Sequence, residues 1–296
     1  MAESRPSVRR RRLAATLVRL REEAGKTPEQ AAERIGCHRS KISRIENARL
    51  GISLGELRDL LMFYGIEDAQ FIEGLVDLAR KGNERGWTRH LGTTLPSYAD
   101  HIDYEQTADY IRSYQPLLIP GLFQTPDYAR ALYRTNPEMI SLEGVEKLVE
   151  TRMRRQAVLD EPGAPRICVI EGEAALRSQV GGSKVMGPQL DRLVELADRP
   201  NIEMQVLPLN TGAHVGLIGA FVLFGFPTPA FSDVVCVEHV TGSLHMETPE
   251  ETGRYTLAFD SLRSAALSPA DSSELIQQIR HELQLTEGRG DHHAYP

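Results

Sequence analysis

The chain has 296 residues, of which 41% are hydrophobic and 25% charged. This composition supplies a packed core and excludes a disordered protein, and the length favours two domains. No run of about 18 apolar residues occurs, so no membrane span is expected, and the Arg-rich start does not resemble a secretory signal. The three scattered cysteines, Cys37, Cys168 and Cys236, form no CxxC pair and indicate neither a disulfide framework nor a zinc site. We therefore expect a protein of the reducing cytoplasm.

The charge is distributed unevenly along the chain. The net charge is -7, yet residues 1–50 contain 13 Lys and Arg against 6 Glu, while the remainder contains 21 against 35 acidic residues. Such a basic N-terminal part is typical of a surface that faces phosphate. Its densest run, Arg9–Arg12, lies just before the first expected helix, and is either an arm that contacts phosphate or a solvated helix start.

Residues 1–82 are expected to form this basic arm and an all-helical domain of about five helices. Leu13, Leu17 and Leu20 recur on one helical face, and Gly25 ends that helix. Further helices are expected from Thr27 to Gly36, from about Arg39 to Asn47, from Leu54 to Tyr64, and from Phe71 to about Gly82.

The segment from residue 27 to 49 has the layout of a helix-turn-helix unit. Thr27-Pro28-Glu29-Gln30 is a capping box with proline at the first helical position. Gly36 permits the left-handed backbone that ends this helix. The next helix must bury Ile42 and Ile45, which turns its other faces outward. In such units the second helix enters the DNA major groove.

This helical phase selects the candidate DNA-contacting residues. Arg39, Ser40 and Arg44 are expected to reach base edges, since arginine donates two hydrogen bonds to guanine and serine suits either base type. Other positions suit phosphate contacts, which fix register without reading sequence. The phosphate candidates are Gln30, Lys41, Ser43, Asn47 and Arg49.

Residues 13–65 resemble the Cro/lambda-repressor-like, xenobiotic-response-element type of helix-turn-helix. The resemblance rests on the LREEAG, TPEQAAERIG and ISRIENAR segments. It implies that Glu46 has a structural role and that a homodimer reads two half-sites about one helical turn apart. His38 departs from the pattern, because the family usually has Ser or Thr as the helix cap at this position.

Residues 83–103 are expected to be a linker rich in Gly and polar residues. Residues 104–285 should form a larger mixed α/β or α+β domain, and residues 286–296 a frayed tail. The helices expected in this domain are 103–113, 125–135, 143–159, 173–178, 185–198, 249–265 and 270–285. The expected strands are 166–171, 202–208, 220–226 and 234–240.

This second part resembles a C-terminal domain of unknown function that follows such a helix-turn-helix in many actinobacterial regulators. The segments that carry the resemblance are IPGLFQTPDYARAL, RMRRQAVL, EGEAALRSQVGG, MQVLPLNTGAHVGLIGAF and TGRYTLAFDSLRSAALSP. It implies a transcription regulator that is often encoded beside a small partner protein. Gln124, Arg155, Glu173 and His214 are candidates for a ligand or partner pocket. The alternative is that Arg155 and Glu173 form a structural ion pair and that His214 is a surface loop residue.

The sequence therefore predicts a DNA-binding transcriptional regulator that binds double-stranded DNA as a homodimer. Its C-terminal domain would sense a ligand or bind a small protein. An alternative is an antitoxin-like pair, in which the domain binds a partner and DNA binding is autoregulatory. An enzyme is a further alternative, but the chain lacks HExxH, GxSxG, phosphate-loop and dinucleotide-binding motifs. We expect no catalysis, no cofactor and no metal.

Overall fold

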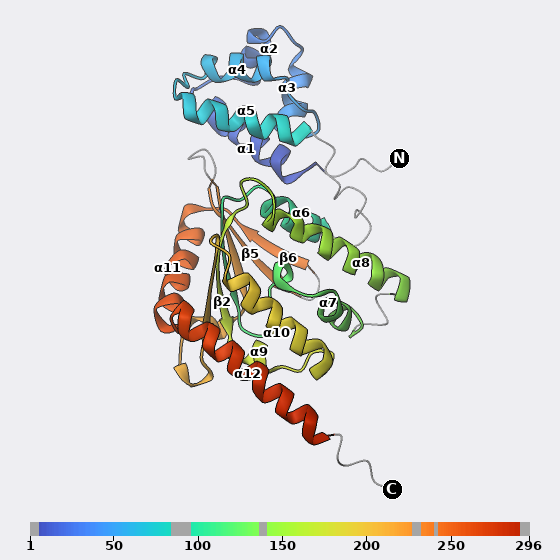
Figure 1. The fold of residues 1–296 in the computed structure, drawn as a ribbon. Helices are drawn as coiled ribbons and strands as arrows, with labels where there is room; N and C mark the ends of the chain where they lie inside the picture. The colour runs from blue at the N-terminus through green and yellow to red at the C-terminus, as the bar shows by residue number, and fades with distance from the viewer. Residues whose placement is uncertain (1–5, 84–95, 136–140, 227–231, 240–241, 291–296) are drawn as a thin grey trace. The chain divides into compact units, whose positions relative to one another are not determined.

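The computed structural model describes residues 6–83, 96–135, 141–226, 232–239 and 242–290 (Figure 1). The chain divides into two compact units. The first contains residues 1–108 with the short pieces 226–232 and 241–243, and the second contains most of the remainder. An all-helical part followed by a domain with a mixed sheet is the predicted fold class, which is confirmed.

Within the described residues 6–83, five helices form the N-terminal part. They are α1 (Val8–Glu23), α2 (Pro28–Arg34), α3 (Arg39–Glu46), α4 (Leu54–Phe63) and α5 (Ala69–Asn83). Their apolar faces share one core, in which Leu17, Ile42, Leu57 and Leu75 are almost fully buried. Burial of this apolar surface holds the short helices in place, because helices of seven or eight residues are not stable alone.

Two boundaries of the N-terminal part differ from the prediction. The Arg9–Arg12 run lies inside α1, which begins at Val8 after Ser7 accepts a hydrogen bond as its cap. Arg12 is buried there, so the run is not a loose arm. Residues 96–103, predicted as linker, belong to helix α6 (Pro96–Glu105), and residues 84–95 lie outside the described part.

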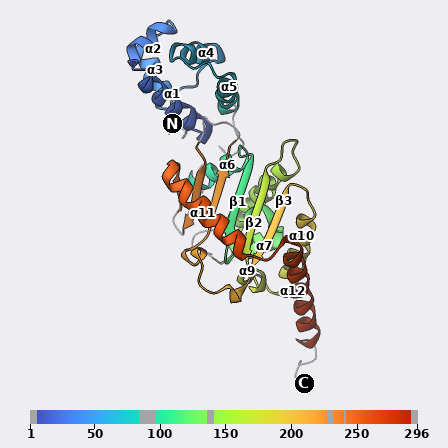
Figure 2. The ribbon, with the colours of Figure 1, turned by 90° about the vertical axis from the view of Figure 1, so that its left-hand side faces the viewer.

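The second part is built on a six-stranded sheet with the order β3-β2-β1-β4-β5-β6 (Figure 2). The strands are β1 (Tyr110–Gln115), β2 (Arg166–Gly172), β3 (Ile202–Leu207), β4 (Phe221–Gly225), β5 (Val234–His239) and β6 (Gly242–Met246). Strands β1, β2 and β3 are parallel, whereas β4 runs antiparallel to β1 and β5 antiparallel to β4. The carboxyl ends of the three parallel strands therefore meet at one edge of the sheet.

Helices cover both faces of this sheet (Figures 1 and 2). On one face, Phe259 and Leu262 of α11 (Pro249–Ala265) pack on Cys168, Ile170 and Leu223. The opposite face carries α7 (Pro126–Tyr133), α8 (Leu142–Arg155) and α10 (Ser183–Ala197). Helix α12 (Pro269–Gly290) packs on α10 and β3. Short helical elements complete the part: η2 (Gly121–Phe123), η3 (Gln156–Leu159), α9 (Glu173–Arg177), η4 (Leu209–Thr211) and η5 (Val215–Ile218).

The four predicted strands are present, but other predicted elements were wrong. Residues 110–113, predicted as helix, belong to the central strand β1, in which Ile111 and Ser113 are buried on one face. Strand β6 was not expected. The predicted tail also begins too early, because α12 continues to Gly290. None of the helices in the described part of the chain is long and apolar enough to cross a membrane.

Candidate DNA interface

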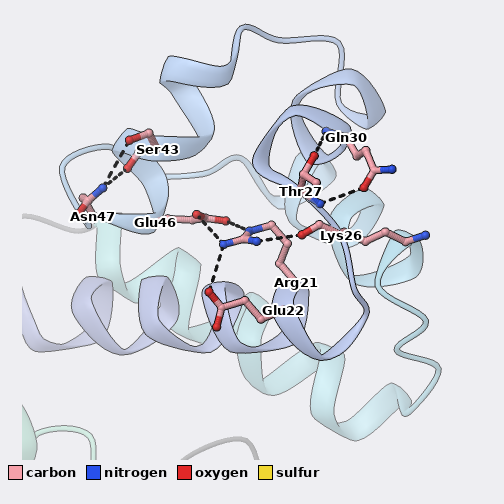
Figure 3. Close-up of polar contacts among 8 residues, drawn as sticks. All are labelled: Arg21, Glu22, Lys26, Thr27, Gln30, Ser43, Glu46 and Asn47. Carbon is pink, nitrogen blue, oxygen red and sulfur yellow. Dashed lines mark hydrogen bonds and ion pairs between the residues drawn. The ribbon is translucent and has the colours of Figure 1, made fainter.

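Helix α2 and the turn after it are fixed by two local motifs, the first of which is drawn in Figure 3. The Thr27 side chain accepts from the Gln30 amide at 3.3 Å, while the Gln30 side chain accepts from the Thr27 amide at 2.9 Å. At the other end, Gly36 has φ +63°, its amide donates to Glu33 O at 3.1 Å and the Cys37 amide to Ala32 O at 2.9 Å. This left-handed ending satisfies two free carbonyls and turns the chain toward α3.

The rotation of α3 follows from its two buried isoleucines. Ile42 and Ile45 are only 1% and 3% exposed, whereas Ser40, Ser43 and Arg44 are exposed. The outward face of α3 is therefore polar and carries the Arg44 guanidinium. Among the described residues, Arg44 has no side-chain hydrogen bond or ion pair, so its donors face solvent.

A largely buried ion pair joins the end of α3 to α1 (Figure 3). Arg21 Nε lies 2.6 Å from Glu46 Oε1, and Arg21 Nη2 lies 3.4 Å from Glu46 Oε2. Arg21 Nη1 also donates to Lys26 O at 2.9 Å. The two side chains are about one-tenth exposed, and the hydrogen bond from Arg21 to Glu46 raises the pKa of the guanidinium. One arginine thus positions both α3 and the chain before α2.

Both ends of α3 carry residues that helices seldom use there. His38 is the N-cap, and its Nδ1 accepts from the Ser40 amide at 3.3 Å. At the C-terminal end Ala48 has φ +57°, with the Arg49 amide donating to Arg44 O at 2.8 Å and the Ala48 amide to Ile45 O at 2.9 Å. The pattern is that of Gly36, with alanine in the position that glycine prefers.

Two known families match parts of the chain. Residues 12–71 match a family described as a helix-turn-helix domain. Residues 98–278, more than half of the chain, match a family described as a domain of unknown function (DUF5753). The chain belongs to the DUF5753 family. No curated protein and no solved structure matches the chain.

The structure gives several DNA-contact candidates in this DUF5753 protein an internal partner. Arg39 Nε lies 2.7 Å from Glu29 Oε1 of α2, although both side chains are largely exposed. Lys41 is half-buried and binds Glu56, whose pKa it lowers. The sequence does not predict either acidic partner, Glu29 or Glu56, and both lie in the helical domain.

The remaining candidates differ in how freely their side chains can reach DNA. Asn47 Nδ2 donates to Ser43 O at 2.7 Å and lies 3.5 Å from Ser43 Oγ, which ties these two side chains together. The Gln30 oxygen is engaged in the capping box. Arg49 is exposed and, within the described residues, has no side-chain partner. Of the candidate arginines that the structure describes, Arg44 and Arg49 are therefore unpaired, whereas Arg39 is paired.

The pocket candidates of the DUF5753 domain lie in two separate groups. Gln124 and Arg155 are both buried around the 116–125 loop: Gln124 Nε2 donates to Ile119 O at 2.7 Å, and Arg155 lies against Gly121. Glu173 instead binds Arg177 at 2.7 Å and accepts from the Leu209 amide at 2.9 Å. The alternative in which Glu173 forms an ion pair with Arg155 is thus wrong.

His214 lies in the loop before β4, as expected. Its ring meets Tyr114 edge-on with centroids 6.5 Å apart, and its Nδ1 is buried without a hydrogen-bond partner in the described residues. No group of three or more His, Cys, Asp or Glu side chains that could hold a metal ion occurs in the part of the chain that the structure describes.

One residue outside the predicted set is conspicuous in the structure. Glu171, at the end of β2, is 1% exposed, and its Oε1 has no hydrogen-bond partner in the described residues. Burial raises the pKa of this carboxyl well above its usual range. It lies in the same sheet row as Gln115 of β1 and Val206 of β3, which a single sequence does not reveal.

Proposed function

We propose that this protein is a sequence-specific transcriptional regulator that places α3 in the DNA major groove. The observation that carries the proposal is the exposed polar face of α3 on a helix anchored by Ile42, Ile45 and the Arg21–Glu46 pair. A fixed backbone with free side chains is what base reading requires, because each base presents a distinct pattern of donors and acceptors in this groove. The helix-turn-helix would be of the Cro/lambda-repressor-like type.

Arg44 is the strongest base-reading candidate, since its guanidinium is unpaired among the described residues and can bind guanine through two hydrogen bonds. Ser40 would contact a base edge beside the one that Arg44 binds. Arg39 would also contact a base. Its ion pair with Glu29 would fix the direction in which the guanidinium points. A positioned arginine loses less conformational freedom on binding than a mobile one.

Phosphate contacts come from the residues around this face. The guanidinium of Arg49 has no ion-pair partner among the described residues, whereas the ammonium of Lys41 is neutralised by Glu56. Gln30, Ser43 and Asn47 would contribute neutral hydrogen bonds at the rim of the helix. Such contacts set the register of the protein on DNA.

The C-terminal domain would control this activity. One α3 reads few base pairs, so we expect a homodimer that binds two half-sites. The domain would sense a ligand or bind a small protein, which includes the antitoxin-like alternative; we do not propose catalysis for it. A ligand that co-purifies, detected by native mass spectrometry, would favour the sensor, and a small protein in a pull-down would favour partner binding.

The test of DNA reading is selection from duplexes with a randomised core, followed by fluorescence anisotropy at two salt concentrations. We expect one enriched motif and much tighter binding to it than to a scrambled duplex. Equal, salt-sensitive binding to both duplexes would refute sequence-specific reading, because phosphate contacts alone produce that result.

A further inference from the structure

Two loops of the C-terminal domain expose large apolar side chains. The 116–125 loop follows β1 and exposes Leu117 and Leu118. The 208–220 loop joins β3 to β4 and exposes Leu209, Leu217 and Ile218, the last two at 72% and 91%. Exposed apolar side chains that gather in one region mark interaction sites.

The sheet topology brings both loops to the same edge. Strands β1 and β3 are both parallel to β2, so the two loops leave the sheet at its carboxyl edge. The 208–220 loop also ends there, because Phe221 of β4 pairs with Tyr114 of β1. Between these ends, Gly216 packs so closely on the Tyr114 ring that a Cβ would lie 2.5 Å from it.

The 116–125 loop is held by hydrogen bonds to side chains that are buried or half-buried. Tyr128 Oη accepts from the Ile119 amide at 3.2 Å, and Gln124 Nε2 donates back to Ile119 O. Gln156 Nε2 donates to Gly121 O and Gln124 O at 3.1 and 2.7 Å, and Gln189 Nε2 donates to Phe123 O at 2.8 Å. The loop therefore presents its leucines on a fixed backbone, which lowers the entropy lost on binding.

The charge pattern indicates what could cover this edge. Neither loop contains Asp, Glu, Lys or Arg, and the whole segment 204–232 is uncharged. Residues 109–296 as a whole are acidic, with 25 Asp and Glu against 16 Lys and Arg. Two copies of this domain therefore carry the same net sign of charge, and a neutral apolar surface is where their repulsion is least.

We propose that the edge formed by Leu117, Leu118, Leu209, Leu217 and Ile218 binds the same edge of a second copy of this chain. The contact is isologous, so each copy supplies both loops. It rests on the proposed function in one respect, since reading two half-sites requires two copies. The dimer gives each DNA site two helix-turn-helix units.

The test measures the molar mass of the full-length protein by sedimentation velocity and light scattering over a range of concentrations. We expect a dimer for the wild type and at least a tenfold higher dissociation constant for Leu217→Ser/Ile218→Ser. Leu117→Ser/Leu118→Ser is a second variant in the other loop and should have the same effect. Leu142→Ser is the matched control, because Leu142 is 76% exposed at the start of α8, outside both loops, and should remain dimeric.

Far-UV circular dichroism establishes that each variant is folded. A monomeric wild type would overturn the proposal, and so would a dimer that persists in both double variants. DNA selection tests the proposed function separately from dimer formation. A folded, monomeric double variant should enrich a single half-site, whereas the wild type should enrich two. Loss of all enrichment in the wild type would contradict the proposed function, whereas the molar mass would still decide independently whether the dimer forms.

Discussion

Arg21 of α1 and Glu46 of α3 form a two-point ion pair that is almost out of contact with water, and Arg21 also binds the carbonyl of Lys26. Helix α3 is therefore oriented by charge at one end as well as by its isoleucines. A buried charge whose partner is removed costs about 3–5 kcal/mol, whereas an apolar replacement of both partners costs far less.

We accordingly expect Glu46→Ala to lower the free energy of unfolding of the helical domain by about 3 kcal/mol. The double change Arg21→Met/Glu46→Leu should lose much less, because no uncompensated charge stays buried. Urea denaturation followed by circular dichroism measures both, with Arg19→Ala as a control for an exposed pair with Glu23. A double variant as unstable as the single one would contradict this account of the pair.

Arg44→Ala should weaken binding to the selected duplex by about 1–3 kcal/mol and relax base preference at one position, because it would remove the proposed bidentate contact with guanine. The fold should be unaffected, since the side chain is exposed. Anisotropy titrations against duplexes substituted at each position measure the change. An Arg44→Ala variant with unaltered affinity and preference would exclude the residue from base reading.

Salt dependence should separate Arg49 from Lys41. Each phosphate contact contributes about 0.9 to the slope of log K against log salt, so Arg49→Ala should reduce the slope by about one. Lys41→Ala should reduce it less, because Glu56 already neutralises Lys41. Titrations at several salt concentrations give the slopes; the reverse order would show that the Lys41–Glu56 pair opens on DNA.

Gly36→Ala should destabilise the helical domain by about 1 kcal/mol, because alanine is strained at φ +63°. No atom lies within 4 Å of the added Cβ, so the effect is one of backbone conformation alone. Gly55→Ala is the matched control: the site is also open, but it lies inside α4, where alanine stabilises by about 0.5–1 kcal/mol. If Gly36→Ala and Gly55→Ala shifted the denaturation midpoint in the same direction, this explanation would be refuted.

Glu171 predicts a pH dependence of stability. Burial raises the pKa of this carboxyl in the folded state, so at intermediate pH the folded protein binds a proton that the unfolded chain releases. The stability that this carboxyl contributes is fully present below about pH 4.5, its ordinary pKa. This contribution is lost as the pH rises toward the folded-state pKa. Glu171→Gln should therefore melt higher than the wild type at pH 8, with the difference shrinking toward pH 4.5. If the difference in melting temperature between Glu171→Gln and the wild type were the same at every pH, the buried, protonated state of Glu171 would be contradicted.

Local signals in the sequence were sufficient for the helix-turn-helix. The capping box at Thr27, the glycine at 36 and the spacing of Ile42 and Ile45 act within a few residues, so they can be recognised without the fold. The partners Glu29 and Glu56 were missed because ion pairs between helices depend on how the helices pack.

The second domain shows the opposite case. Residues 110–115 became a strand because β2 and β4 pair with them on both sides, and that partnership depends on residues more than 50 positions away. Glu171 and the neutral sheet edge are likewise products of strand order. Glu173 and Arg155 are both polar residues near glycines or strand ends in the sequence, but the fold places Arg155 of α8 against Gly121 and Glu173 of α9 against Leu209.

The clamps on the 116–125 loop have a consequence for the conditions under which that loop keeps its shape. Its backbone is held by the amide side chains of Gln124, Gln156 and Gln189, which neither titrate nor carry charge. The remaining clamp, Tyr128, has its pKa raised by burial to about 12. Changes in ionic strength that reorganise ion pairs at the protein surface should therefore leave these hydrogen bonds in place.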